Sequence, residues 1–180
     1  MFKVAIVGAG SWGTALAHVA AKNNNSTHLW VRRRELADEM INTGENTQYL
    51  PCAKVSPKIH ISTDLEHVVS DADIVIMAVP SHTVRNMAKL IRNFIKKDAI
   101  VTSASKGIEL GSLKRMSQVL AEELDNIRQE NIVALSGPSH AEEVIRNLPT
   151  AIVAASSEQE AAQKVQDALI NSKFRVYTNT

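Results

Sequence analysis

A glycine-rich turn near the start of the chain has the residue types that bind a diphosphate through backbone amides. Gly8, Gly10 and Gly13 follow the apolar run Val4–Val7 and precede residues of helical character. In a strand, turn and helix, the first glycine permits the turn, the second lets backbone N–H groups approach a diphosphate, and the third lets helix and strand pack closely. The helix N-terminus favours an anion without any basic side chain. Because flexible turns also collect glycine, the flanking strand and helix carry this prediction.

The basic run after the next apolar segment indicates which dinucleotide is bound. Arg32, Arg33 and Arg34 follow the strand-like segment His28–Val31, where an acidic residue would bind the ribose 2′-hydroxyl of NAD. Guanidinium groups pair with a 2′-phosphate, which a carboxylate would repel. The alternative is a solvated basic helix start, although helix N-termini favour acidic residues. We therefore expect NADP (NADPH) as the preferred cofactor, with NAD still usable.

Three further segments carry small or polar residues where predicted strands end, and they read "MAVPSH", "TSASKG" and "LSGPSHA". Ligands of open α/β sheets bind at the carboxyl ends of the strands, although ordinary turn chemistry would explain any single segment. Lys106 is the only lysine among them, and its cation could neutralise a phosphorylated substrate or polarise its carbonyl. An exposed loop lysine is the alternative. Ser139, with the N–H groups that follow it, could hold an oxyanion at a helix start.

The elements that must position these residues alternate between apolar runs and amphipathic segments, which is typical of a doubly wound α/β fold. We expect strands in Val4–Val7, His28–Val31, Asp73–Val79, Ala99–Thr102, Ile132–Leu135, Ala151–Ala154 and Phe174–Tyr177. We expect helices in Ser11–Lys22, Arg34–Thr43, Ser81–Phe94, Ser112–Leu124, His140–Asn147 and Ser157–Asn171. The stretch Gly44–Ser62 predicts a long connection with a short strand at Ile59–Ile61. The expected fold is Rossmann-type, with a mostly parallel sheet and helices on both faces.

Composition narrows the function classes. The chain has 180 residues, of which 44% are hydrophobic and 22% charged, which suits one globular domain over residues 1–180. A net charge of +1 and an aromatic content of 4% argue against nucleic acid as a partner. Cys52 is the only cysteine, so no internal disulfide is possible, and no motif proposes a metal. Because no signal peptide and no apolar stretch of about 20 residues is present, we expect a cytoplasmic protein without membrane insertion.

Taken together, "VGAGSWGTALA", "LWVRR", "VPSH", "SKGIE", "SGPSHAEEV", "LPTAIVAAS" and "FRVYTN" resemble bacterial NAD(P)H-dependent glycerol-3-phosphate dehydrogenase, in family order over the whole chain. The resemblance implies interconversion of dihydroxyacetone phosphate and sn-glycerol 3-phosphate, which feeds glycerophospholipid synthesis. It leaves a homodimer of the full-length protein open. It places cofactor contacts at Ser11, Trp12, Arg32, Arg33, Lys106 and Ala141, and substrate contacts at Lys106, Gly137 and Ser139.

One departure from the family bears on catalysis. The resemblance implies a second, helical domain after the last strand, with a proton-transferring lysine in a GGxxKN-type motif. No segment of residues 1–180 matches that motif, so we expect cofactor binding with poor turnover. Two alternatives stay open: another two-domain reductase, acting on ketopantoate or a hydroxy acid, and a non-catalytic NAD(P)-binding redox sensor. Lys106 and the strand-end serines disfavour the sensor, which needs no electrophile beside the nicotinamide.

Overall fold

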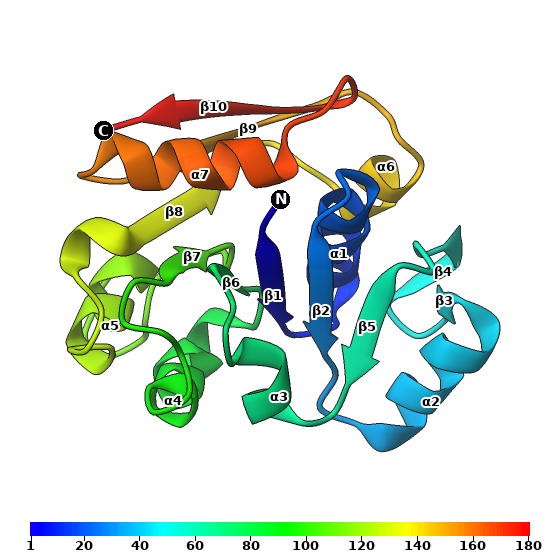
Figure 1. The fold of residues 1–180 in the computed structure, drawn as a ribbon, viewed down its shortest axis with the longest axis horizontal. Coiled ribbons are helices and arrows are strands. Elements are labelled where there is room, and N and C mark those ends of the chain that lie inside the picture. The colour runs from blue at the N-terminus through cyan, green and yellow to red at the C-terminus, as the bar shows by residue number, and fades with distance from the viewer.

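Eight strands form one sheet that carries helices on both faces in the computed structural model, which describes residues 1–180 (Figure 1). The strand order is β10-β9-β8-β7-β6-β1-β2-β5, and all neighbours are parallel except β8 and β9. The chain leaves β1 toward β2 and later returns to β6 on the other side of β1. Ligands of such sheets bind at this reversal point.

The strands of the main sheet are β1 (Lys3–Val7), β2 (Ser26–Trp30), β5 (Ile59–Ser62), β6 (Ile74–Met77), β7 (Ile100–Ser103), β8 (Ile132–Ser136), β9 (Thr150–Ala155) and β10 (Phe174–Asn179). A separate hairpin contains β3 (Glu45–Asn46) and β4 (Leu50–Lys54). The helices are α1 (Ser11–Lys22), α2 (Arg34–Thr43), α3 (Leu65–Val69), α4 (Ser81–Ile91), α5 (Met116–Glu123), α6 (Ala141–Ile145) and α7 (Gln159–Leu169). None of these helices has the length and apolar character needed to cross a membrane.

The doubly wound fold with a mostly parallel sheet is confirmed, and α1 and α2 have the predicted bounds. Several predicted bounds were wrong, among them that of the second strand, which spans Ser26–Trp30 and not His28–Val31. The helix predicted at Ser112–Leu124 begins only at Met116, because Ile108 and Arg115 form an antiparallel bridge that closes the preceding segment into a turn. The strand predicted at Asp73–Val79 spans only Ile74–Met77, since the residues after it line a cavity.

The remaining helix predictions were too long at their ends. The segments predicted as Ser81–Phe94, His140–Asn147 and Ser157–Asn171 contain the shorter helices α4, α6 and α7. The long connection predicted over Gly44–Ser62 does contain a short strand, β5, which pairs with β2 at the sheet edge. It also contains the β3–β4 hairpin, which the sequence analysis missed, as it missed α3.

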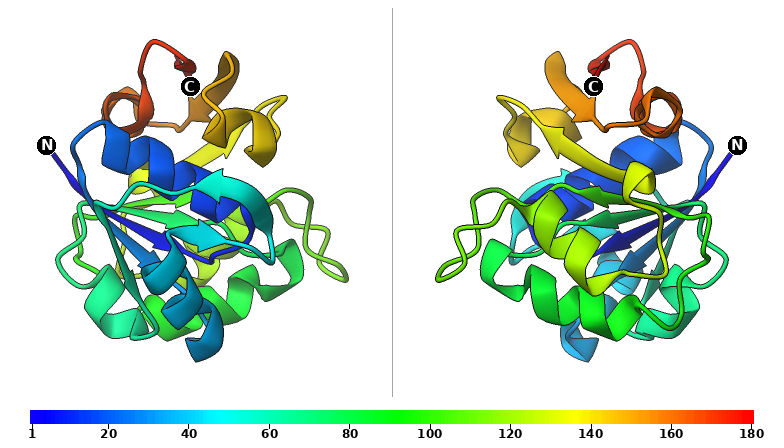
Figure 2. Two further views of the ribbon diagram at one scale, coloured as in Figure 1. Left: turned by 90° about the vertical axis from the view of Figure 1, so that its right-hand side faces the viewer. Right: turned by 90° about the vertical axis from the view of Figure 1, so that its left-hand side faces the viewer.

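The hydrophobic core has two parts, one on each face of the sheet. Alternation along β1 sends Val4 and Ile6 into a cluster of 36 buried residues, and Ala5 and Val7 into a cluster of 19. The larger cluster packs against α1, α6 and α7, and the smaller one against α3, α4 and α5, as the side views also show (Figure 2). Because both faces are covered, the central strands are apolar throughout, and the strand ends are the places left for ligands.

Candidate functional site

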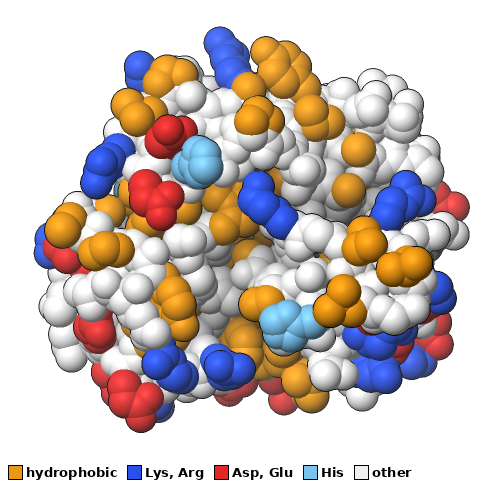
Figure 3. Space-filling view, turned by 180° about the vertical axis from the view of Figure 1, so that it is seen from behind, with side chains coloured by type: hydrophobic (Ala, Val, Ile, Leu, Met, Phe, Trp, Pro, Cys, Tyr) orange, Lys and Arg blue, Asp and Glu red, His pale blue; other side chains and the backbone are white.

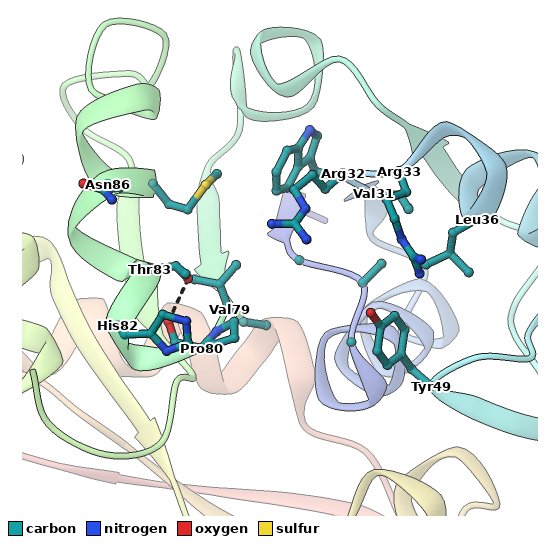
Figure 4. Close-up of a pocket in the computed structure, with 16 residues that line it drawn as sticks. Val31, Arg32, Arg33, Leu36, Tyr49, Val79, Pro80, His82, Thr83 and Asn86 are labelled. Atoms are coloured by element: carbon teal, nitrogen blue, oxygen red, sulfur yellow. Dashed lines mark hydrogen bonds between the residues drawn. The ribbon is translucent and has the colours of Figure 1, made fainter.

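A cavity of about 460 Å³ opens at the carboxyl ends of β1, β2 and β6, at the reversal point of the sheet. Its walls are the glycine turn after β1, the arginine-bearing segment after β2, the start of α4, and Tyr49 from the β3–β4 hairpin (Figure 4). The face of the molecule shown in Figure 3 is hollowed near its centre, with basic and acidic side chains interspersed around it. The location agrees with the sequence prediction of a ligand at the strand ends.

The three glycines of the turn have different surroundings. Gly8 has a φ of +113°, and a Cβ there would lie 2.7 Å from the carbonyl oxygen of Ala78. A Cβ on Gly13 would lie 1.9 Å from the carbonyl oxygen of Gly8, so only glycine lets α1 pack this closely on the turn. Gly10 lines the cavity, and a Cβ there would meet nothing within 4 Å. The first and third glycines are therefore required by the fold, whereas the second leaves space for a ligand.

The backbone amides of this turn lack partners. The N–H groups of residues 9 to 13 donate to no acceptor within the protein. Gly10 is the N-cap of α1, no side chain caps the helix, and its first turn contains no acidic residue. Unpaired N–H groups at the positive end of a helix dipole form a site for an anion. Ser11 and Trp12, the first residues of α1, belong to this row of amides.

The arginines after β2 differ in what they contact. Arg32 and Arg33 are exposed and line the cavity, and Arg32 has no ion pair or hydrogen bond. Arg33 donates to Gln48 and lies over the ring of Tyr49, with 5.9 Å between guanidinium carbon and ring centroid. Arg34 instead pairs with Asp38 at 3.4 Å and lies outside the cavity lining. Only Arg32 is thus wholly available to an anionic ligand.

The opposite wall is mainly apolar. Val79 and Pro80 line it from the segment between β6 and α4, and Met87 lines it from α4, together with the polar side chains of His82 and Thr83 on the same helix (Figure 4). The Thr83 hydroxyl donates to the carbonyl oxygen of Pro80 at 2.8 Å, which satisfies it locally. An apolar wall facing exposed cations suits a flat aromatic base joined to a phosphorylated sugar.

Lys106 lies outside the cavity lining, in the turn after β7, and its side chain is exposed. A Cβ on Gly107 would lie 3.4 Å from the Ser81 hydroxyl, so this turn runs beside the first residue of α4. The Ser105 hydroxyl donates to the carbonyl oxygen of Val79 at 2.6 Å and ties the turn to the cavity wall. Lys106 therefore lies next to the α4 wall of the cavity, on the side away from the arginines.

The other predicted site residues also lie outside the cavity lining. A Cβ on Gly137 would lie 2.8 Å from the Cα of Ile152, so this glycine permits the close approach of β9. The Ser139 hydroxyl donates to the carbonyl oxygen of Gly137 at 3.4 Å. Ala141 is buried at the start of α6, which packs on α1. The structure brings these residues together beyond the end of β8, outside the lining of the cavity described above.

Sequence reasoning missed Thr83, Asn86 and Met87 on α4, which line the cavity, and two residues of the β3–β4 hairpin. Tyr49 lines the cavity, and Asn46 is fully buried beneath the glycine turn. Both belong to the β3–β4 hairpin, in the segment interpreted as a connection. The only sequence feature that could have indicated these two residues is that the segment contains an aromatic side chain and amide side chains.

Comparison with known proteins identifies the family. The model of the NAD-dependent glycerol-3-phosphate dehydrogenase N-terminus matches residues 3–162. The chain belongs to this family. It is 47% identical over 98% of its length to glycerol-3-phosphate dehydrogenase [NAD(P)+] of Moorella thermoacetica, and 46% identical over 99% to that of Bacillus subtilis. It spans about half the length of these relatives, covering 51% and 52% of them.

The fold agrees with that of a solved family member. The crystal structure of glycerol-3-phosphate dehydrogenase from Coxiella burnetii superposes with a TM-score of 0.90 at 32% identity, covering 99% of this chain and 54% of that one. The sheet described above therefore has the fold of the corresponding part of that enzyme.

Proposed function

We propose that this chain is the cofactor-binding part of an NAD(P)-dependent glycerol-3-phosphate dehydrogenase, which interconverts dihydroxyacetone phosphate and sn-glycerol 3-phosphate. The single observation that carries this proposal is the row of unpaired N–H groups at residues 9 to 13, beside a cavity with a free Arg32 on its far wall. The names of the relatives support the reaction. We propose that the reaction occurs in the cytoplasm and supplies glycerophospholipid synthesis.

The site offers places for the diphosphate and the adenosine of a dinucleotide. Its diphosphate would accept hydrogen bonds from the amides of residues 9 to 13, and its adenosine would occupy the cavity between α4 and Tyr49. Arg32 would pair with a 2′-phosphate, which favours NADP over NAD. When bound, the nicotinamide supplies the hydride; the residues of this chain hold the cofactor and neutralise charge.

The substrate side of the proposal rests on Lys106, Gly137 and Ser139. The exposed ammonium of Lys106 would neutralise the substrate phosphate or polarise its carbonyl, and Ser139 would donate a hydrogen bond to it. The alkoxide formed by hydride addition needs a proton, which we assign to a lysine outside residues 1–180. We therefore expect residues 1–180 to bind cofactor and to turn over poorly.

Titration calorimetry of residues 1–180 with NADPH and NADH tests the cofactor site. We expect both to bind, NADPH more tightly. Arg32→Ala should weaken NADPH by about tenfold or more, the loss of one charge-assisted pair, and leave NADH nearly unchanged. Arg34→Ala is the matched control, because Arg34 pairs with Asp38 away from the cavity. Binding of neither nucleotide would overturn the proposal.

Testing the choice of substrate requires a protein of the same length as the relatives. Reduction of dihydroxyacetone phosphate that disappears with unphosphorylated dihydroxyacetone supports the assignment. Activity with ketopantoate or a hydroxy acid that is independent of phosphate would move the protein to the alternative reductases. Unchanged activity after Lys106→Ala would remove this lysine from the reaction.

A further inference from the structure

Asn46 is a fully buried polar side chain beneath the glycine turn, with an exposed fraction of 0%. Its side-chain nitrogen donates to the carbonyl oxygen of Ala9 and to the hydroxyl of Thr14, both at 2.9 Å. Its side-chain oxygen accepts from the backbone N–H of Tyr49 at 3.2 Å. One amide therefore joins the glycine turn, the first turn of α1 and the β3–β4 hairpin.

The bond to Ala9 orients the next amide. The carbonyl of Ala9 and the N–H of Gly10 belong to one trans peptide plane, in which they point in opposite directions. Because Asn46 draws the carbonyl inward, the N–H of Gly10 is turned away from Asn46. That N–H has no partner within the protein, and Gly10 lines the cavity. Without the bond from Asn46, this peptide could rotate, since Gly10 tolerates almost any backbone angle.

The bond from Tyr49 fixes the other side of the cavity. Tyr49 lines the cavity, and the guanidinium of Arg33 lies 5.9 Å above its ring. Gln48, its neighbour, accepts a hydrogen bond from Arg33. The turn of the hairpin therefore positions Arg33 through Gln48 and Tyr49, and Asn46 in turn fixes the hairpin through its bond to Tyr49.

We propose that Asn46 is a positioning residue for the dinucleotide, which aims the amide of Gly10 at the diphosphate and sets the wall formed by Tyr49 and Arg33. This inference rests on the proposed function. The role requires an asparagine, because the site uses two N–H donors and one acceptor at once. An ionised aspartate offers no donor to Ala9 and would bring a negative charge toward the diphosphate.

Calorimetric titration of Asn46→Ala with NADPH and with NADH tests the proposal. We expect the dissociation constants of both nucleotides to rise by about tenfold, because both contain the diphosphate that faces Gly10. The rise should be larger for NADPH, since only NADPH has a 2′-phosphate that the arginine side of the cavity could bind. Asn46→Asp keeps the side-chain shape and the acceptor for Tyr49, so it supplies a second variant, and we expect it to lose at least as much affinity.

Asn131→Ala is the matched control. Asn131 is 5% exposed and donates to the carbonyl oxygens of Asp98 and Ala99, outside the cavity lining. We expect Asn131→Ala to lower the melting temperature, as we expect of Asn46→Ala, without changing nucleotide affinity. Affinities within twofold of wild type in folded Asn46→Ala or Asn46→Asp, or equal losses in Asn131→Ala, would overturn the positioning role. A wild-type protein that binds neither nucleotide would instead overturn the proposed function.

Discussion

The two halves of the strand-end surface differ in how completely they are built. On the side of β1 and β2, the glycine turn, the hairpin and α4 enclose a cavity of about 460 Å³. On the side of β7 and β8, Lys106 is exposed and the hydroxyl of Ser139 bonds only to its own turn. The proposed cofactor site is thus enclosed, whereas Lys106 is exposed and Gly137 and Ser139 are half-buried outside the cavity lining.

The open side is nevertheless rigidly anchored. The segment between β7 and α5 projects from the body of the molecule (Figure 2). Arg85 of α4 holds its base through two hydrogen bonds to Glu109, at 2.7 and 2.8 Å. These bonds lower the pKa of Glu109 to about 2. Lys106 is therefore exposed even though the base of the segment that carries it is fixed to α4.

The glycine turn offers the largest test of this difference. Gly13→Ala forces a Cβ to within 1.9 Å of a backbone oxygen, so we expect it to lower the free energy of unfolding by about 3 kcal/mol or more. Gly10→Ala has open space and should change stability by only about 0.5 kcal/mol while weakening both nucleotides. Urea denaturation and calorimetry measure the two effects. Equal destabilisation by both would mean that the cavity side is not preformed.

Replacing Arg32 on the enclosed side and Lys106 on the exposed side compares how much each side contributes to cofactor binding. In residues 1–180, Arg32→Ala should raise the dissociation constant of NADPH by about tenfold or more, and Lys106→Ala by less than about threefold, because Lys106 is exposed and lies outside the cavity lining. Fluorescence titration of both variants measures this. An equal or larger loss in Lys106→Ala would show that the open side already binds the cofactor.

A falling pH should destabilise the side of β1 and β2, where the cavity lies, before the side of β7 and β8. Burial, together with Lys3, His60 and His67, lowers the pKa of His28 on β2 to about 4. The unfolded chain therefore binds this proton more tightly than the folded one, and the stabilisation, complete above pH 6.5, is lost as the pH falls through about 4. The ion pair of Glu109 is lost only as the pH falls from 4.5 through about 2.

Urea midpoints of wild type and His28→Phe at pH 7 and pH 5 measure this smallest effect. We expect the midpoint of wild type to fall more than that of the variant. His140→Gln, which changes an exposed histidine, should behave as wild type. Hydrogen exchange at pH 5 should show the amides of β2 opening before those of the segment that Glu109 anchors. The reverse order would contradict the expectation that acid destabilises the side of β2 first.

The elements that carry strong local signals were predictable. The apolar period and flanking glycines of α1 and α2 determine their bounds, and unbroken apolar runs mark the buried strands. The same runs do not distinguish β8 from β9, which pair antiparallel, because strand direction depends on the path of the chain between them. The β3–β4 hairpin was missed because β3 has only two residues, and because β4 contains Pro51 and lacks an alternating apolar pattern.

The sequence by itself determined the turn, its glycines and the basic residues that follow β2, because these depend on backbone geometry and on neighbours along the chain. Only the tertiary structure decided that Arg32 is free while Arg33 contacts the hairpin, and that Asn46 supports the turn. The bonds of Asn46 to Ala9 and Thr14 join residues 37 and 32 positions apart. Contacts of that span form only when the sheet, α1 and the hairpin have packed, so no local pattern encodes them.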